Sequence, residues 1–256
     1  MFYHKISVIS TLFFQKNVAQ WGRDMRTDAL LSRFGYCSRR EAAAWVKRGR
    51  VMYRGEVVKN AAAKVEPAEV LVDGEPVPFA EGLYVAFYKP LGCTCSHKEE
   101  GDLVYDLLPE MWLARNPGVN TVGRLDKETS GLLLLTDDGK FEHAMTSPRR
   151  HVPKVYEFTT SAPVPASAVS LFASGELLLQ GETSPCLPAE LEITGECSGR
   201  LTLHEGRYHQ VRRMLASVGA PVETLCRVEI GPMKLAELNL EPGEWVVFDP
   251  EMFDVR

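Results

Sequence analysis

The chain has 256 residues, of which 45% are hydrophobic, 25% charged and 9% aromatic, and its formal net charge at pH 7 is -5. This composition is typical of a globular protein with one or two hydrophobic cores, and it excludes collagen-like, fibrous and wholly disordered chains. No stretch approaches the roughly 18 to 20 consecutive apolar residues that a membrane-spanning helix needs, which excludes an integral membrane protein.

The six cysteines are scattered along a chain that is too long to need disulfide bridges for stability. This usage predicts a reducing compartment, and we expect the protein in the cytoplasm. Cys93 and Cys95 form the one close pair, but a one-residue gap is not typical of zinc ligands, and no second pair completes a site. We therefore expect no metal site.

Charge is distributed unevenly along the chain. The segment from Arg26 to Lys64 holds ten basic and three acidic residues, a net charge of +7, whereas residues 65–256 carry -14. Such segregation is typical of a basic binding module attached to an acidic body, although a solvated basic face gives the same count. The basic segment makes a nucleic-acid partner plausible despite the negative charge of the whole chain.

Residues 1–24 superficially resemble a secretory signal, because Lys5 precedes a short apolar stretch. Ser7 and Ser10 interrupt that stretch and no small-residue cleavage site follows it, so we reject this interpretation. We expect residues 1–24 to be a disordered N-terminal extension, or to reflect a start assigned too early.

The first patterned elements are two short helices and a hairpin. Apolar spacing predicts a helix over residues 27–34 and a second over 38–48. Ser38 and Glu41 have the spacing of a capping box at the start of the second helix. Residues 51–58, with an Arg-Gly turn at their middle, predict a tight hairpin.

This segment, which we delimit as residues 25–75, resembles the S4-like RNA-binding domain. The resemblance rests on L-S-R-F-G-Y-C-S-R-R-E-A at residues 31–42, G-R-V at 49–51 and D-G at 73–74. It implies binding to structured RNA, largely through phosphate groups, which carry little sequence information. The residues expected to bind RNA are Arg33, Arg39, Arg40, Lys47, Arg48, Arg50 and Arg54.

Residues 76–83, with two prolines and a glycine, predict a flexible linker. A second domain over residues 84–256 follows, and its strands are expected at Tyr84–Tyr88, Leu132–Leu135, Lys154–Phe158, Glu190–Ile193 and Arg200–His204. The unbroken apolar strand Leu132–Leu135 is preceded by a polar loop over residues 123–131. Such a loop places its polar groups at the rim of the core, where sites are often built.

Taken alone, Asp126 in this loop is more often a surface carboxylate than a catalyst, and Arg124 is as often an ion-pair partner as a ligand-binding group. Two further polar segments favour a site. One is the strand over 154–158, and the other is a basic turn over 204–213 that leads into an amphipathic helix ending near Gly219.

These motifs, in this order, resemble the pseudouridine synthases that isomerise uridines in ribosomal RNA. The motifs are K-P-L-G at 89–92, G-R-L-D at 123–126 with T-S-G-L-L-L-L-T-D-D-G at 129–139, K-V-Y-E at 154–157, E-G-R-Y-H-Q-V-R-R-M-L at 205–215 and L-x-P-G-E-W at 240–245. T-S-P-R-R-H at 146–151 most resembles the small-subunit type, which acts on 16S ribosomal RNA.

The resemblance implies an α+β fold: a small N-terminal S4-like RNA-binding domain, then a catalytic domain over 84–256 with a large mixed, mostly antiparallel sheet. It places Asp126 on a loop at the centre of that sheet. It also implies an isomerase that needs no cofactor, because the reaction is redox-neutral and adds no group.

The resemblance assigns catalytic roles to Asp126, Tyr156 and Arg212. Asp126 is the carboxylate that starts the reaction, by addition to the base, attack on the sugar or removal of a sugar proton, alternatives that the sequence leaves open. Arg212 is expected to pair with Asp126 and keep it ionised in a pocket. Tyr156 is expected to stack on the uracil, although a cross-strand packing role is compatible with the same pattern.

A paired uridine reaches such a pocket only after extrusion from the RNA, which costs a few kcal/mol. Arg124, Lys154 and Arg213 are the expected substrate-binding residues, and simple solvent exposure is the alternative for them. The expected partner is 16S ribosomal RNA or an assembling small-subunit particle, bound by a monomer and without a membrane. The rival interpretations are a large-subunit synthase of the same family and a non-catalytic assembly factor that binds ribosomal RNA.

Overall fold

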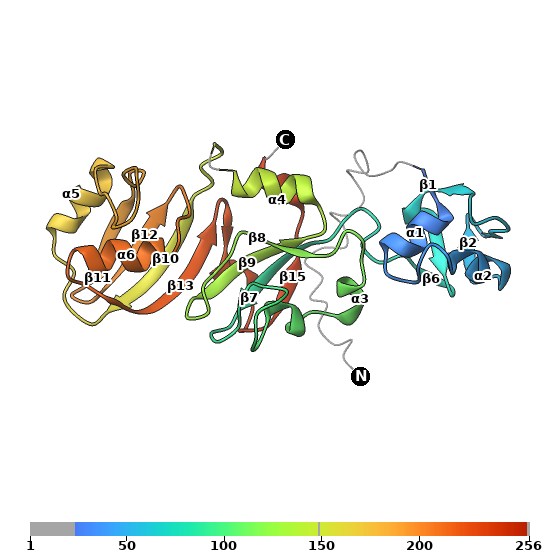
Figure 1. Ribbon diagram of the computed structural model, residues 1–256, viewed down its shortest axis with the longest axis horizontal. Helices are drawn as coiled ribbons and strands as arrows, with labels where there is room; N and C mark the ends of the chain where they lie inside the picture. Colours follow the sequence, from blue (N-terminus) through green and yellow to red (C-terminus); the bar gives the residue numbers. More distant parts are fainter. Residues whose placement is uncertain (1–23, 148, 255–256) are drawn as a thin grey trace. The chain divides into compact units, whose positions relative to one another are not determined.

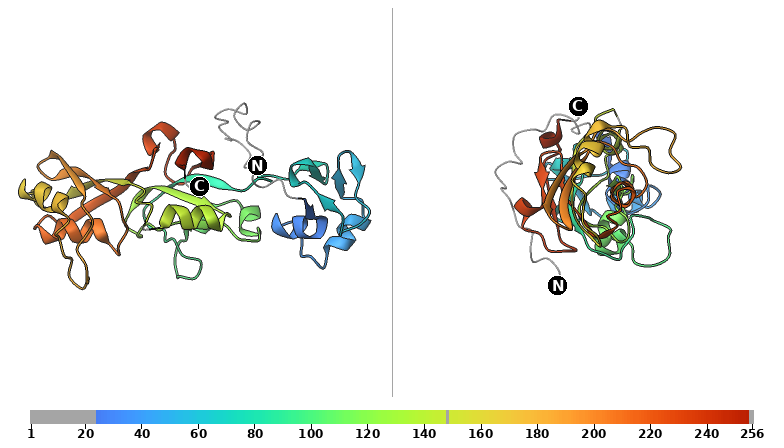
Figure 2. Two further views of the ribbon diagram at one scale, coloured as in Figure 1. Left: turned by 90° about the horizontal axis from the view of Figure 1, so that it is seen from above. Right: turned by 90° about the vertical axis from the view of Figure 1, so that its left-hand side faces the viewer.

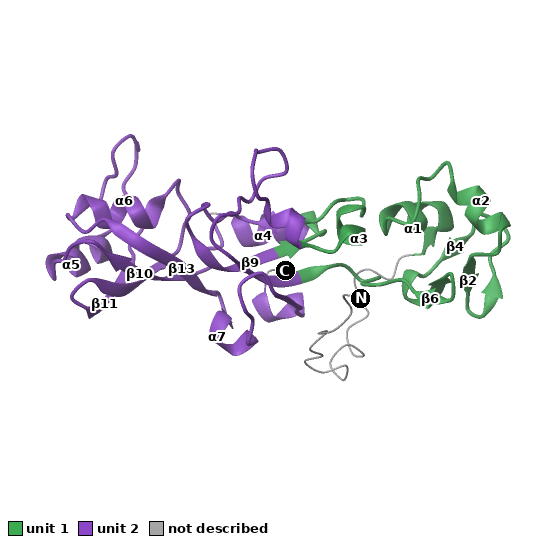
Figure 3. Ribbon diagram, turned by 90° about the horizontal axis from the view of Figure 1, so that it is seen from below, with its two compact units in different colours: residues 1–84, 108–120, 135–139 green, residues 85–107, 121–134, 140–256 purple. Residues whose placement is uncertain are grey.

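The structure, a computed structural model, describes residues 24–147 and 149–254. Except for Asp24, the predicted N-terminal extension lies outside the described residues. The chain separates into two compact units (Figure 3). Unit 1 comprises residues 1–84, 108–120 and 135–139, and unit 2 comprises residues 85–107, 121–134 and 140–256.

Unit 1 begins with the predicted order of helix, helix and hairpin, which is confirmed. Its elements are β1 (Met25–Arg26), α1 (Thr27–Arg33), α2 (Ala42–Lys47), β2 (Val51–Tyr53), β3 (Glu56–Val57), β4 (Lys64–Val65), a 3-10 turn (Pro67–Glu69), β5 (Val70–Val72), β6 (Glu75–Pro76) and α3 (Glu110–Leu113). Strands β3, β2, β5 and β6 form a sheet in that order, and β1 pairs with β4.

The core of unit 1 forms where the apolar faces of α1 and α2 meet the sheet. Leu30 and Leu31 of α1 and Val46 of α2 pack with valines of β2 and β5. Glu41 accepts hydrogen bonds from both the backbone N–H and the hydroxyl of Ser38, which forms one half of the expected capping box, but α2 begins at Ala42 rather than at Ser38 and has no side-chain cap.

A buried arginine joins the separate segments of unit 1. The side chain of Arg115 is 2% exposed, and its Nη2 lies 2.7 Å from Oδ2 of Asp137, which is 1% exposed. Arg115 also donates hydrogen bonds to the carbonyls of Pro78 (3.3 Å) and Phe79 (3.1 Å), within the segment 76–83. Its guanidinium lies 4.8 Å from the ring centroid of Phe34.

Unit 2 is built around a large sheet, which takes up nine strands of the described chain (Figure 1). The strands are β7 (Tyr84–Lys89), β8 (Asn120–Val122), β9 (Ser130–Thr136), β10 (Lys154–Thr160), β11 (Glu190–Gly195), β12 (Ser198–Leu203), β13 (Val222–Ile230), β14 (Met233–Lys234) and β15 (Trp245–Val247). Their order is β11-β12-β10-β13-β9-β7-β15, with β14 beside β13 and β8 beside β9.

The sheet is mixed and mostly antiparallel, as predicted. Strand β10 runs antiparallel to both β12 and β13, whereas β13 and β9 are parallel. Gly131 lies at this parallel contact, where an added Cβ atom would be 2.2 Å from the carbonyl oxygen of Arg227, so only glycine allows the close approach.

Helices and turns connect the strands of unit 2. They are a 3-10 turn (Val104–Leu107), α4 (Gly139–Thr146), α5 (Ser167–Ser174), α6 (Gln210–Ser217), α7 (Leu235–Leu238) and a second 3-10 turn (Pro250–Phe253). Phe172 of α5 and Met214 of α6 share one core with Phe158 of β10 and Leu225 of β13. Helices α5 and α6 therefore cover one face of this part of the sheet (Figure 2), which we call the α6 face.

Within the described residues, none of the helices is long and apolar enough to cross a membrane.

Candidate active site

Asp126 lies in the loop that joins β8 to β9, as predicted. The loop closes on itself, because the N–H of Thr129 donates a hydrogen bond to the Asp126 carbonyl (3.1 Å). The Asp126 side chain is 31% exposed, so its carboxylate is accessible at the rim of unit 2.

Several distant segments of unit 2 hold the backbone of this loop. The N–H of Gly92 donates to the carbonyl of Lys127 (2.9 Å), and the N–H of Leu125 donates to Sγ of Cys95 (3.5 Å). From α6, Nη2 of Arg212 donates to the carbonyl of Glu128 (2.7 Å). The residues on both sides of Asp126 are thus fixed, which orients the carboxylate.

Lys89, at the end of β7, is fully buried beneath the same loop. Its Nζ donates to the carbonyls of Thr129 (2.8 Å), Pro90 (3.1 Å) and Lys127 (3.5 Å). Burial lowers the pKa of Lys89, and the nearby Asp126 carboxylate acts against that shift. Lys89 therefore joins the K-P-L-G segment to the loop.

The partner of the Asp126 carboxylate differs from the expectation. Nε2 of His209 lies 3.4 Å from Oδ1 of Asp126, a contact that is an ion pair only when the imidazole is protonated, and no other cationic side chain of the described residues lies within 4.0 Å of this carboxylate. His209 is the residue before α6 and has a left-handed backbone (φ 48°), which turns its ring towards the loop. The adjacent Tyr208, which is 76% exposed, stacks on the His209 ring with centroids 3.9 Å apart.

The expected ion pair between Asp126 and Arg212 is not present. Arg212 follows the start of α6, and its guanidinium reaches the loop two residues beyond Asp126, at the carbonyl of Glu128. The helix thus supplies two contacts to the loop: His209 on the carboxylate and Arg212 on the backbone. Spacing within the motif could not distinguish these two contacts.

Tyr156 lies on β10 with its side chain on the α6 face. It is partly buried and packs against the core beneath α5 and α6. Its register partners are Leu201 on β12 and Arg227 on β13. The structure therefore shows the cross-strand packing role, which does not preclude contact with a substrate.

Lys154 lies two residues before Tyr156 and consequently on the same face. Its Nζ donates to the carbonyl of Val152 (3.1 Å). Burial, with repulsion from Arg227, lowers the pKa of Lys154 to about 8.

The remaining two predicted substrate-binding residues differ in their surroundings. Arg124 is 72% exposed and lies 3.9 Å from Glu99. Arg213 is engaged within unit 2: it bonds Glu182 (2.7 Å) and the carbonyls of Gln180 (2.6 Å) and Tyr208 (3.1 Å). The structure thus gives Arg213 an internal role and leaves Arg124 accessible.

Five of the predicted RNA-binding residues of unit 1 fall into two groups. Arg39, Arg50 and Arg54 pair with carboxylates of the same unit, and Arg50 also lies over the ring of Trp45. Arg40 and Arg48, which flank α2, are exposed and have no ion pair or hydrogen bond from their side chains within residues 24–147 and 149–254.

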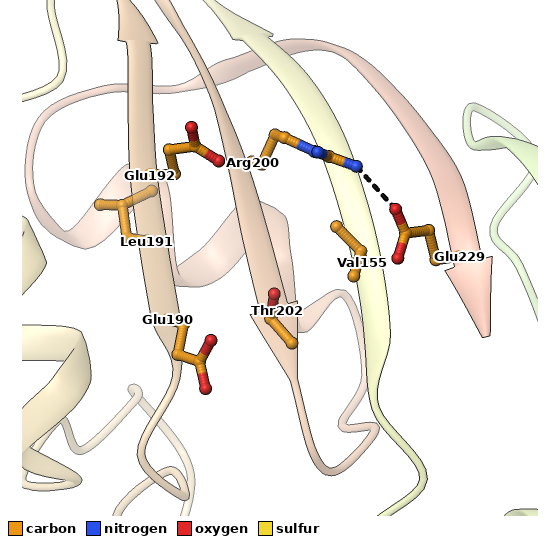
Figure 4. Close-up of a pocket in the computed structure, with 7 residues that line it drawn as sticks. All are labelled: Val155, Glu190, Leu191, Glu192, Arg200, Thr202 and Glu229. Atoms are coloured by element: carbon orange, nitrogen blue, oxygen red, sulfur yellow. Dashed lines mark hydrogen bonds and ion pairs between the residues drawn. The ribbon is translucent and has the colours of Figure 1, made fainter. Parts of the chain in front are cut away.

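A hollow of about 300 Å³ lies on the sheet face opposite α6 (Figure 4). Arg200 of β12 reaches across β10 and pairs with Glu229 of β13 (2.9 Å) at this hollow. None of the predicted catalytic residues lines it, so it is distinct from the candidate site.

Sequence reasoning noted His209 only within a basic cluster and missed Arg227. His209 lies in the motif that supplies Arg212, so the motif placed it near the loop without showing which of the two residues meets the carboxylate. Arg227 lies within a strand and carried no pattern beyond an arginine between apolar neighbours. Its partners come from two other strands, β9 and β10, which only the fold brings beside β13.

Comparisons with known proteins match both units. A family model for RNA pseudouridylate synthase matches residues 83–175, and one for the S4 domain matches residues 25–71.

The groups of three or more His, Cys, Asp or Glu that a metal ion needs are absent from the described residues.

Curated relatives are similar over most of the chain. The ribosomal small subunit pseudouridine synthase A of Pasteurella multocida is 40% identical over 225 residues, which covers 86% of this chain and 94% of the relative. Its counterpart in Escherichia coli is 39% identical over 226 residues, with 86% and 95% covered. A crystal structure of a pseudouridylate synthase superposes with a TM-score of 0.62 at 35% identity, covering 90% of this chain and 98% of that one.

Proposed function

Because the chain belongs to the RNA pseudouridine synthase family, we propose that it isomerises a specific uridine of 16S ribosomal RNA to pseudouridine, with Asp126 as the reacting carboxylate. The observation that carries this proposal is the accessible Asp126 carboxylate on a loop fixed from both sides, in a chain 40% identical to a small-subunit enzyme. A non-catalytic RNA-binding protein has no need of such a loop.

The proposed reaction conserves every atom of the nucleotide. The bond between the sugar carbon C1′ and uracil N1 breaks, the uracil rotates, and C1′ bonds to C5. C5 then loses its proton and N1 gains one, so no oxidant or group donor is required. Asp126 assists the first bond cleavage, either by bonding to the sugar or the base or by removing a sugar proton.

The side chains around Asp126 have distinct proposed tasks. Tyr156 holds the detached ring against the sheet while it rotates. His209 supports the negative charge of Asp126, and Arg212 holds the Asp126 loop in place through its hydrogen bond to the Glu128 carbonyl. Exposed Arg124 occupies the space that the extruded uridine leaves in the RNA, and Lys154 contacts the nucleotide, whereas Arg213 serves substrate binding indirectly, by holding the turn that carries Tyr208.

Unit 1 is proposed to hold the RNA while unit 2 performs the chemistry. Arg40 and Arg48, together with Arg33, Arg39, Lys47, Arg50 and Arg54, provide phosphate contacts that tolerate many sequences. A monomer is sufficient for this scheme, since the proposed residues all lie in one chain. The proposed substrate is 16S RNA, free or within an assembling particle in the cytoplasm.

Mapping pseudouridine in ribosomal RNA tests the proposal. RNA is compared from cells with the gene, without it, and without it but supplied with the Asp126→Asn chain. We expect one position of 16S RNA to lose pseudouridine on deletion and to regain it only with the wild-type chain. Loss from 23S RNA would establish the large-subunit alternative, and an unchanged pattern would contradict the enzymatic proposal.

A further inference from the structure

Arg227 is a buried cation that the roles above do not use. It lies on β13, it is 2% exposed, and its Nε donates to the carbonyl of Leu132 (2.7 Å). Its Nη2 is buried and has no hydrogen-bond partner. A buried charged donor without a partner destabilises the fold unless another group meets it.

A second cation shares this environment. Lys154 and Arg227 repel each other, and within the described residues neither forms an ion pair with a carboxylate. The carboxylates of Glu157 and Glu229 pair instead with Arg200, on the opposite face. A buried and a partly buried like charge without an acid destabilise the fold, which indicates that an electron-rich group from outside the chain belongs beside them.

The position of this pair connects it to the candidate site. Arg227 is the register partner of Tyr156, so their Cβ atoms lie about 4.5 to 5.5 Å apart on the same face. The register of β10 and β13 shifts between Val155 and Tyr156, a bulge of the kind that redirects side chains beside active sites. The charge of Arg227 also acts on Cys95, whose sulfur accepts the N–H of Leu125, next to Asp126.

We propose that Arg227 is a further catalytic residue, whose Nη2 donates a hydrogen bond to a carbonyl oxygen of the extruded uracil while Lys154 adds positive charge beside it. This inference rests on the proposed function and names the group that receives the detached base. Stacking on Tyr156 would bring the edge of the ring to the neighbouring strand position, where Arg227 lies.

The chemistry explains why a cation is needed there. When the C1′–N1 bond breaks, its electron pair leaves with the uracil, and the negative charge spreads over N1 and the two carbonyl oxygens. A guanidinium that donates to one of these oxygens stabilises the developing anion. When the new C1′–C5 bond has formed, C5 has lost its proton and N1 has gained one, the ring is neutral again and the contact weakens.

A double-mutant cycle between protein and RNA tests this contact. The target uridine, first located by mapping, is placed in an RNA fragment as uridine, 2-thiouridine or 4-thiouridine, and single-turnover rates are measured at saturating enzyme. A third fragment carries a phosphorothioate beside the target. The variants are Arg227→Met and Arg227→Lys, and the matched control is Arg200→Met, an arginine on the opposite face of the same sheet.

We expect Arg227→Met to slow isomerisation of the uridine fragment by about 100-fold, with the RNA dissociation constant within about twofold of wild type. One of the two thio substitutions should slow the wild-type chain about tenfold and the Arg227 variants less than twofold, whereas Arg200→Met should behave as wild type. Arg227→Lys keeps the charge but loses the Nη2 donor, so it gives the same answer if Arg227→Met folds poorly.

The same thio effect in wild type and Arg227→Lys would overturn the inference, because an arginine that only supports β9 has no coupling to a substrate atom. Coupling to the phosphorothioate instead of the carbonyl would overturn it as well. These outcomes require a wild-type chain that converts the unmodified fragment. A wild-type chain without that activity would refute the proposed function itself.

Discussion

Two buried arginines, one in each unit, have opposite surroundings. Arg115 of unit 1 bonds a buried carboxylate, two backbone carbonyls and an aromatic face. Arg227 of unit 2 bonds a single carbonyl, keeps one nitrogen without a partner and repels a second cation. The first arrangement is complete without a ligand, whereas the second is incomplete.

This difference separates a structural buried charge from a functional one. Removing a charge from water is expensive, and only good pairing and hydrogen bonding offset the cost. Unit 1 meets that requirement, so Arg115 holds its segments together. Unit 2 does not meet that requirement beside Tyr156. The charge of Lys154 and the unused donor of Arg227 are consequently available to bind a substrate there.

The largest expected loss of stability follows from breaking the buried pair of Arg115 and Asp137. Arg115→Met leaves the Asp137 carboxylate buried and unpaired, so we expect the free energy of unfolding to fall by about 3 to 5 kcal/mol. Urea denaturation measures this loss. Arg54→Met, which breaks an exposed ion pair of the same unit, is the matched control and should cost far less, because solvent screens an exposed pair. Equal losses in the two variants would show that burial does not distinguish the two pairs.

A substitution beside Arg227, in the incomplete arrangement, is expected to raise the free energy of unfolding instead of lowering it. At pH 7, Lys154 is charged in both the folded and the unfolded chain, and burial beside Arg227 penalises only the folded form. We therefore expect Lys154→Met to raise the free energy of unfolding by on the order of 1 to 3 kcal/mol, while slowing isomerisation.

The pH dependence of the stability gained in Lys154→Met tests whether Lys154 is the cause. Since the pKa of folded Lys154 is about 8 and its ordinary value is 10.5, the unfolded chain binds the extra proton between these values. Wild-type stability then rises with pH relative to the variant. We expect the stability difference between Lys154→Met and wild type, measured by urea denaturation, to become smaller as the pH rises from 7 to 9.5. In the Arg227→Met background the pKa of Lys154 is higher, so this decrease should occur at higher pH. A constant advantage would contradict a buried, charged Lys154.

Much of the fold was predictable because its signals are local. The apolar run Leu132–Leu135 lies in the buried strand β9, and the alternation after Lys154 lies in β10. The Ser38–Glu41 spacing predicted the observed hydrogen bonds between these two residues. Each of these signals depends on residues that are neighbours in the chain.

The contacts within the site were less predictable because they join distant segments. Both His209 and Arg212 lie in one motif, yet the left-handed backbone at His209 decides which of them meets the carboxylate. Arg227 depends on the register between β13 and β10, including a bulge that no local pattern marked. The inclusion of residues 108–120 in unit 1 likewise rests on the long-range contact between Arg115 and Asp137.

The central claim is that the Asp126 carboxylate performs chemistry on RNA rather than supporting the loop. The most direct measurement compares single-turnover pseudouridine formation and RNA affinity for wild type and Asp126→Asn, on a fragment that contains the mapped uridine. The account predicts at least about a 1000-fold loss of rate, with the dissociation constant within about twofold of wild type. Turnover by Asp126→Asn at a rate near that of the wild-type chain would contradict it.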